Sequence, residues 1–181
     1  ANIIETGAGN DTLDGDAGLD TLIGGMGDDH YIVAQGGDVI VELGGAGNDI
    51  VSSSTSYTLS ANLETLLLTG NVANNGTGNA DNNTIYGNSA ANIINGAGGA
   101  DIMAGGAGGD QYWVDNAGDI VSETVADGLA IDTVRSTLNW TLAENIENLV
   151  LVGPSAITGV GNNLSNSMIG NDAANLLDGG E

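Results

Sequence analysis

A repeat of nine residues constrains this chain more than any other feature of its sequence. From Thr6 the sequence reads TGAGNDTLD, GDAGLDTLI and GGMGDDHYI, which places Asp11, Asp20 and Asp29 in one phase. The phase extends from Asn2 to Asp38. A large apolar residue follows each of these positions two residues later: Ile4, Leu13, Leu22, Tyr31 and Ile40. A short fixed period is typical of solenoids, in which each repeat is one rung and successive rungs stack.

The same period organises the middle and the end of the chain. The polar positions of the second run are Asn74, Asn83, Asn92, Asp101, Asp110 and Asp119. Its apolar positions are Ile85, Ile94, Met103, Tyr112 and Val121. A third run begins at Asn166 and Asn175. Asp and Asn therefore alternate as blocks at the same place in the repeat.

Each nine-residue unit predicts a turn followed by a short strand. Glycine at several of the first four positions permits a tight turn with positive φ, and the alternating tail around the apolar residue favours extended structure. Two units make one coil, so stacked coils form two sheets with strands about 4.8 Å apart and the apolar residues between them. The predicted fold class is all-β, a parallel β-solenoid.

The charge of the chain requires a partner for this fold. Twenty-four Asp and Glu residues stand against one basic residue, Arg135, for a formal net charge of −23. In a coil of two units the carboxylates stack and repel: Asp11 under Asp29, Asp20 under Asp38, Asp101 under Asp119. A hard cation between the coils removes the repulsion, and Ca²⁺ accepts six to eight oxygen ligands in flexible geometry. Soft metals lack ligands, because His30 is the only imidazole and there is no Cys.

The units GGMGDDHYI and GGAGGDQYW closely resemble the repeats-in-toxin (RTX) family of calcium-binding β-roll proteins, whose phrase is GGxGxDxUx with U a large apolar residue. The resemblance is strongest at 6–41 and 96–122. It implies several calcium ions between consecutive turns, held by the Asp at the sixth position and by loop carbonyls. The Asp residues so marked are Asp11, Asp20, Asp29, Asp38, Asp101, Asp110 and Asp119. The carbonyl donors so marked are Gly7, Gly9, Gly18, Gly25, Gly27, Gly36, Gly99, Gly106 and Gly108.

A longer period encloses the short one. Residues 49–70 match residues 132–153 in order, and the phrase at 1–4 recurs at 91–94 and 174–177. We therefore divide the chain into super-repeats of about 83–90 residues. The first covers 1–90, with β-roll 1–42, variant rungs 43–73 and Asn-type rungs 74–90. The second covers 91–173, with β-roll 91–122, variant rungs 123–160 and Asn-type rungs 161–173. A third begins at 174–181.

The departures from the pattern predict differences between the rungs. Asn is a poorer cation ligand than Asp, so we expect metal-free turns around 74–95 and 162–177, where stacked Asn side chains bond to one another. The phrase from Gly44 is out of phase by two residues, so the sequence alone does not decide whether Asp49 belongs to a calcium site. Closely spaced apolar residues at 50–73 and 133–156 indicate wider solenoid rungs, with a separate capping or spacer element as the alternative.

The composition narrows the function. The negative charge excludes nucleic acid as a partner, and no run of about 20 apolar residues predicts membrane insertion. No HExxH, GxSxG or phosphate-loop motif occurs, so we predict no enzyme. We expect a calcium-folded structural segment of a large secreted or cell-surface bacterial protein, an adhesin or extracellular fibre. The open rungs at both ends predict pairing with flanking repeats or end-to-end self-association. The alternatives are a folding and export module of a secreted RTX enzyme and, last, a sugar- or ice-binding surface.

Overall fold

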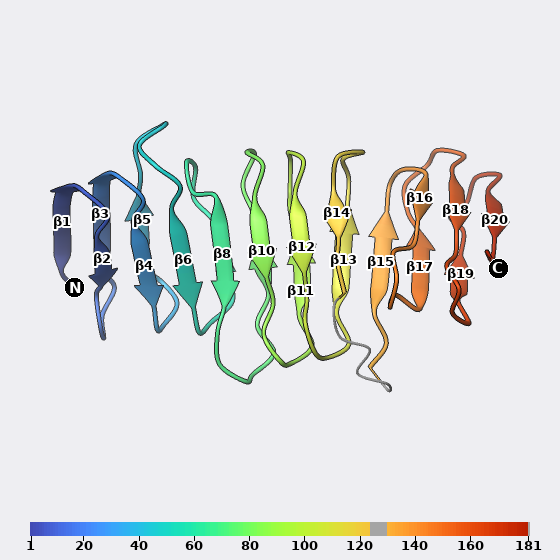
Figure 1. The fold of residues 1–181 in the computed structure, drawn as a ribbon, viewed down its shortest axis with the longest axis horizontal. Helices are drawn as coiled ribbons and strands as arrows, with labels where there is room; N and C mark the ends of the chain where they lie inside the picture. The colour runs from blue at the N-terminus through green and yellow to red at the C-terminus, as the bar shows by residue number, and fades with distance from the viewer. Residues whose placement is uncertain (124–129, 181) are drawn as a thin grey trace.

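Short parallel strands, stacked in one direction, form a flattened solenoid in the computed structural model (Figure 1). The structure describes residues 1–123 and 130–180. Within them lie β1 (Ile3–Ala8), β2 (Thr12–Asp14), β3 (Thr21–Met26), β4 (His30–Val33), β5 (Val39–Val41), β6 (Ile50–Ser53), β7 (Tyr57–Thr58), β8 (Thr65–Leu68), β9 (Gly76–Thr77), β10 (Thr84–Tyr86), β11 (Ile93–Asn95), β12 (Ile102–Ala104), β13 (Gln111–Val114), β14 (Ile120–Val121), β15 (Thr133–Ser136), β16 (Trp140–Thr141), β17 (Asn148–Leu151), β18 (Thr158–Val160), β19 (Ser167–Ile169) and β20 (Leu176–Asp178). The predicted all-β parallel solenoid is confirmed.

Consecutive strands alternate between two faces. One face carries β1-β3-β5, and after a break it continues as β7-β9-β11-β13-β15-β17-β19. The other face carries β2-β4-β6-β8-β10-β12-β14, and after a break it continues as β16-β18-β20. Two edges of loops connect the faces. At edge 1 the chain passes from an odd-numbered to an even-numbered strand, and at edge 2 it passes back.

The register of the regular coils is the predicted one. Ile3 pairs with Thr21, Thr12 with His30, and Thr84 with Ile102, so each partner lies two nine-residue units further along the chain. The predicted apolar positions point inward and are buried, with the exception of the half-buried Ile4 in the outermost coil. They are Leu13, Leu22, Tyr31, Ile40, Ile85, Ile94, Met103, Tyr112 and Val121. The core is thus a single file of side chains between two sheets.

The variant stretches continue the solenoid, with coils of unequal length. His30 pairs with Ile50, Ile50 with Thr65, and Thr65 with Thr84, so the first of these coils is longer than a regular coil, the second is shorter and the third is again longer. The second copy runs through Gln111, Thr133, Asn148 and Ser167 with the same order of long, short and long coils. The alternative prediction, a separate capping or spacer element, is therefore wrong. Within the predicted stretches the expected widening is only partly right. The coils that begin at Ile50 and Thr133 are narrower than a regular coil, and the coils that follow them are wider.

Corresponding strands of the matching stretches 49–70 and 132–153 lie on opposite faces of the solenoid. Strand β6, which begins at Ile50, corresponds in sequence to β15, which begins at Thr133, and nine strands separate them along the chain. Because nine is odd, the matching stretches 49–70 and 132–153 lie on opposite edges, whereas the phrase at 1–4 and its copy at 91–94 are ten strands apart and share edge 2.

The predicted boundaries 90/91 and 173/174 both fall in loops, and the super-repeat division itself stays a prediction. Residues 124–129 of the variant rungs and residue 181 of the third copy lie outside the described residues. Among the described residues, no helix has the length and apolar character needed to cross a bilayer.

Candidate metal centres

A ladder of acidic and amide side chains follows each edge of the solenoid, one residue per coil, just before a strand. On edge 1 the ladder is Asp11, Asp29, Asp49, Glu64, Asn83, Asp101 and Asp119. On edge 2 it is Asn2, Asp20, Asp38, Asn74, Asn92, Asp110, Asp132, Glu147 and Asn166. All seven predicted Asp ligands are therefore ladder residues. Six of them are buried, and Asp11 is half-buried.

Each ladder carboxylate is tied to the coil before it by one oxygen. The backbone N–H of Asp11 donates to Oδ1 of Asp29 at 2.8 Å, that of Asp20 to Asp38 at 3.0 Å, and that of Asp101 to Asp119 at 3.1 Å. These bonds confirm the predicted stacking of carboxylates that are one regular coil apart. They also aim every carboxylate across the gap between two coils, where a bridging ion would lie.

The second carboxylate oxygen carries the argument for a metal. Oδ2 of Asp20, of Asp29 and of Asp101 is buried and has no hydrogen-bond partner among the described residues. The side chains are at most 1% exposed. An unpaired buried carboxylate costs several kcal/mol or more, so such an oxygen calls for a cation. Because every donor in these loops is an oxygen, the residues fit calcium.

The protein itself supplies almost no positive charge to these sites. The only ion pair recorded among the described residues joins the N-terminal amine to Asp20. Arg135 lies on the outer face of β15 with its guanidinium 5.5 Å from the ring centre of Trp113, and its Nε donates to Gln111. The ladders therefore depend on protons or on ions from solution.

Burial raises the pKa of three of the buried acids, Asp49, Asp101 and Glu123. Desolvation raises the pKa of Asp101 to about 6, although the backbone N–H of Asn83 partly offsets the shift. Desolvation likewise raises the pKa of Asp49 to about 6 and of Glu123 to about 7. Near neutral pH these carboxylates ionise against the cost of burial, and a cation relieves that cost.

The first glycine of each turn makes room for the ladder side chain. A Cβ at Gly96 would lie 2.0 Å from Oδ2 of Asp101, and one at Gly24 or Gly105 would lie 2.1 Å from Oδ2 of its Asp. None of these three glycines has positive φ, so space and not backbone conformation requires them. Positive φ belongs to the second and fourth positions of the turn, as at Gly25 and Gly27.

The predicted carbonyl donors lie at the same two edges, Gly7 and Gly25 near the ends of β1 and β3 and the others in loops. Gly7, Gly9, Gly25, Gly27 and Gly99 are on edge 1, whereas Gly18, Gly36, Gly106 and Gly108 are on edge 2. The carbonyl of Gly18 accepts a bond from Nε2 of Gln35, which occupies one of its lone pairs. The roles of these glycines and of the seven Asp residues as ligands remain predictions.

The asparagine turns bridge the coils differently from what the sequence suggested. Nδ2 of Asn83 donates to the carbonyl of Leu63 at 2.9 Å, and Nδ2 of Asn92 donates to the carbonyl of Asn74 at 2.6 Å. Oδ1 of Asn83, Asn92 and Asn166 accepts a backbone N–H of its own turn, as from Asn79 to Asn83 at 2.7 Å. The expected bonding between stacked Asn side chains is therefore wrong, because the amides bond to backbone carbonyls of the neighbouring coil.

A second asparagine completes each of these turns, which share the phrase GNxxxN at 78–83, 87–92, 161–166 and 170–175. Nδ2 of Asn79 donates to the carbonyls of Ser60 and Leu63 at 2.7 and 2.9 Å, and Nδ2 of Asn162 donates to those of Ala143 and Ile146. The amide hydrogens thus reach carbonyls of the coil below, where a calcium turn would use an ion. The chain has two kinds of turn, one acidic and one neutral.

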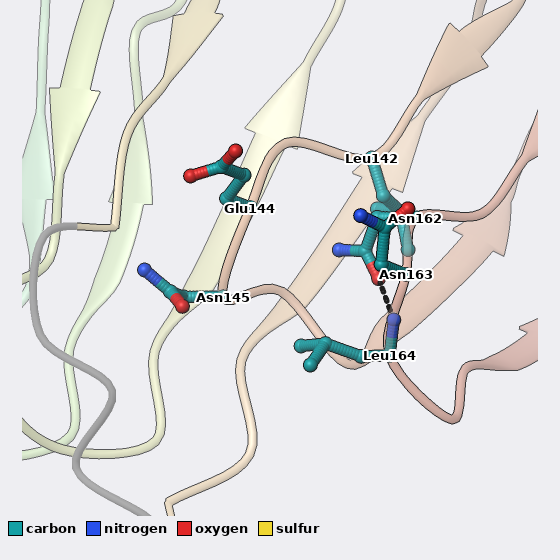
Figure 2. Close-up of a pocket in the computed structure, with 6 residues that line it drawn as sticks. All are labelled: Leu142, Glu144, Asn145, Asn162, Asn163 and Leu164. Atoms are coloured by element: carbon teal, nitrogen blue, oxygen red, sulfur yellow. Dashed lines mark hydrogen bonds between the residues drawn. The ribbon is translucent and has the colours of Figure 1, made fainter. Parts of the chain in front are cut away.

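Figure 2 shows one neutral turn beside a cleft of about 410 Å³ lined by Leu142, Glu144, Asn145, Asn162, Asn163 and Leu164. Oδ1 of Asn162 accepts the backbone N–H of Leu164 at 2.9 Å, which closes the turn. These six lining residues offer a single carboxylate, Glu144, and no imidazole, hydroxyl or thiol. These six described residues therefore provide no pair of groups for acid–base or nucleophilic chemistry.

Two clusters of three buried carboxylates stand out where the repeat slips phase. The first triad is Asp29, Glu42 and Asp49, and the second triad is Asp110, Glu123 and Asp132. Sequence reasoning missed both Glu residues and left Asp49 open. The available signal was Glu in place of the first glycine of a turn, one regular coil after Gly24 and Gly105, at the point where the spacing changes.

Alanine at Gly96 tests the packing of the ladder. The added Cβ would displace the Asp101 carboxylate, so we expect Gly96→Ala to lower the free energy of unfolding in calcium by about 1–3 kcal/mol. Denaturant titration of both chains in calcium measures the difference. Gly44→Ala is the matched control, since its Cβ would meet only Asn62 Oδ1 at 3.5 Å. Equal stability of the Gly96→Ala and Gly44→Ala chains would contradict this packing.

The raised pKa values predict opposite pH effects with and without calcium. A carboxyl whose folded pKa exceeds its unfolded value stabilises the fold below about pH 4 and loses that contribution as the pH rises through about 6–7. In chelator, lowering the pH from about 8 to about 5 should therefore increase strand content. In calcium, the same change should raise the calcium concentration at half-folding, because protons compete with the ion. Circular dichroism measures both quantities. A loss of strand content in chelator on acidification, or a lower calcium concentration at half-folding, would be inconsistent with buried carboxylates as the ligands.

Comparison with known protein families agrees with the geometry. The family model of the RTX calcium-binding nonapeptide repeat matches residues 1–40 and 77–112 in four copies. No curated protein and no solved structure matches this chain significantly. The matched segments lie in the parallel β-solenoid and hold part of both acidic ladders, including Asp29 and Asp101. Residues 1–40 and 77–112 are therefore RTX calcium-binding nonapeptide repeats, in a β-solenoid that is a calcium-binding structural module.

Proposed function

We propose that this module is a calcium-folded structural segment of a large secreted or cell-surface bacterial protein, an adhesin or extracellular fibre. Calcium acts as the folding switch. Where the ion is scarce, as inside a cell, the chain is a self-repelling coil suited to export. Outside, millimolar calcium exceeds the dissociation constants of about 10⁻⁴–10⁻³ M that are typical of extracellular calcium modules, and the solenoid forms.

The observation that carries this proposal is the burial of acidic side chains along both edges without compensating charge. Asp20, Asp29 and Asp101 each bury an oxygen that no described residue satisfies, in a chain with one basic side chain and a net charge of −23. A chain that buries so many carboxylates folds when cations bind them, and repels itself when they do not.

The shape supports a spacer or fibre role. Every coil contacts only its neighbours, so length is added without a change in the cross-section. The matching stretches 49–70 and 132–153 are nine strands apart, so their loops lie on opposite edges of the solenoid. A segment of this kind sets the distance between parts of a larger protein.

The folding and export tail of a secreted enzyme is the second candidate, and the same acidic ladders favour it. Both roles need calcium to order the chain after export. They differ in what adjoins the solenoid, since the enzyme role requires a catalytic domain in the same polypeptide. The sequence that flanks this segment in its gene distinguishes them.

Calcium titration of the whole chain tests the proposal. Circular dichroism in EGTA should show a disordered chain, and addition of millimolar calcium should produce a strand-rich spectrum. The same concentration of Mg²⁺ should not, because Mg²⁺ demands an octahedron and retains its water. Asp101→Asn should raise the calcium midpoint at least several-fold, whereas Asp172→Asn at an exposed position should leave it unchanged. A strand-rich spectrum that persists in EGTA would rule the switch out.

A further inference from the structure

The two carboxylate triads differ from the repeating ladder sites in composition. A ladder site pairs one Asp with the next across a coil gap. Each triad adds a Glu, and one oxygen from each of its three carboxylates lies within 4.8 Å of the other two. Every triad side chain is at least nine-tenths buried. The first triad belongs to edge 1 and the second to edge 2, as the offset of nine strands between the matching stretches requires.

The longer coils allow Glu to stand where the repeat needs glycine. Glu42 follows Gly24 by one regular coil, and at Gly24 a Cβ would lie 2.1 Å from Oδ2 of Asp29 and 2.2 Å from the Tyr31 hydroxyl. The coil from His30 to Ile50 and the one from Gln111 to Thr133 are both longer than a regular coil. In the first triad the added residues fall between Glu42 and Asp49, and the Glu42 carboxylate lies beside those of Asp29 and Asp49.

Each Glu is held from both neighbouring coils. The Tyr31 hydroxyl donates to Oε1 of Glu42 and accepts the backbone N–H of Gly24 at 2.9 Å. From the next coil, Nδ2 of Asn62 donates to the backbone carbonyl of Glu42 at 2.9 Å. The second triad repeats the arrangement with Tyr112, Gly105 and Asn145 around Glu123. Asn62 and Asn145 adopt φ of 65° and 64°, a conformation that Asn tolerates better than most residues.

An unsatisfied buried oxygen lies in each triad. Oδ2 of Asp29 has no hydrogen-bond partner among the described residues and belongs to a side chain that is 1% exposed. Oε2 of Glu123, in a side chain that is 6% exposed, likewise has no hydrogen-bond partner among the described residues. Three carboxylates brought together in this way repel unless a cation lies among them. The held geometry and the free oxygen both point to an ion.

We propose that the two triads are a separate, tighter class of cation site, one in each super-repeat, that takes a hard cation of the calcium type. Calcium affinity rises with the number of charged ligands and the rigidity of the site. A triad offers three carboxylates, one of them fixed by a tyrosine, whereas a ladder site offers two carboxylates and backbone carbonyls. The triads therefore fill at lower free calcium than the ladder sites. The inference rests on the proposed function, since it assumes that the chain binds calcium.

Competition between the chain and a chromophoric calcium chelator tests the proposal by counting tightly bound ions. The wild-type chain should bind two ions in a tight phase and the remainder in a weaker one. Glu42→Gln and Glu123→Gln should each remove one tight ion, by weakening its site about tenfold or more, and the double variant should remove both. Glu5→Gln and Glu144→Gln, at exposed positions, are the matched controls and should keep both.

Terbium(III) luminescence gives a second readout on the wild-type fold. The Tyr31 and Tyr112 hydroxyls contact the triad glutamates, so the first two equivalents of terbium should emit through tyrosine excitation. A Tyr31→Phe, Tyr112→Phe chain should lose that emission, whereas Tyr86→Phe, 45% exposed, should keep it.

Two outcomes would overturn the inference while calcium-dependent folding stands: retention of both tight ions by the double variant, or early terbium emission that does not depend on Tyr31 and Tyr112. A wild-type chain that neither binds calcium nor folds with it would instead refute the proposed function.

Discussion

Repulsion between stacked carboxylates is the constraint on which the rest of this structure depends. A solenoid with a single file of apolar side chains buries little surface per coil, so the bonds between coils at the two edges decide whether it is ordered. The acidic ladders place like charges one above another on both edges, with backbone N–H groups holding one oxygen of each carboxylate. Metal ions bound between these carboxylates would convert that repulsion into a bridge, which is the basis of the proposed calcium-dependent folding.

The chain connects neighbouring coils in two ways. In the acidic turns, positive-φ glycines fold the backbone around the space between two Asp side chains. In the GNxxxN turns, two Asn side chains donate directly to carbonyls of the coil below. In the proposed function the first kind needs calcium, whereas the second is bridged by the chain's own amides. The two kinds alternate in blocks along the solenoid.

Much of the fold could be predicted from the sequence because the repeat carries the information redundantly. One phase defines the inward apolar residue, the ladder residue and the register of two units per coil, and all three agree with the structure. The expectation of a hard cation rested on the absence of thiols and on the single imidazole. Closely spaced apolar residues favoured continuity of the solenoid through 50–73, with a separate capping element as the alternative.

The features that the sequence did not reveal depend on three-dimensional detail at single positions. The triads arise because a slip in the repeat admits Glu42 beside Asp29, and no local pattern gives the size of that space. The first glycine of the turn was assigned to backbone conformation, whereas it serves to avoid the ladder carboxylate. The asparagine ladders were expected to bond side chain to side chain. That expectation failed because the turn directs the amides toward backbone carbonyls of the previous coil.

The central claim is that ions bridge the acidic turns and not the asparagine turns. Anomalous diffraction at long wavelength from crystals grown in calcium tests it most directly. The account predicts peaks on both edges between successive Asp residues and within the triads, and none in the GNxxxN turns. Ordered crystals whose acidic turns give no anomalous peak, or whose asparagine turns give equal peaks, would contradict it.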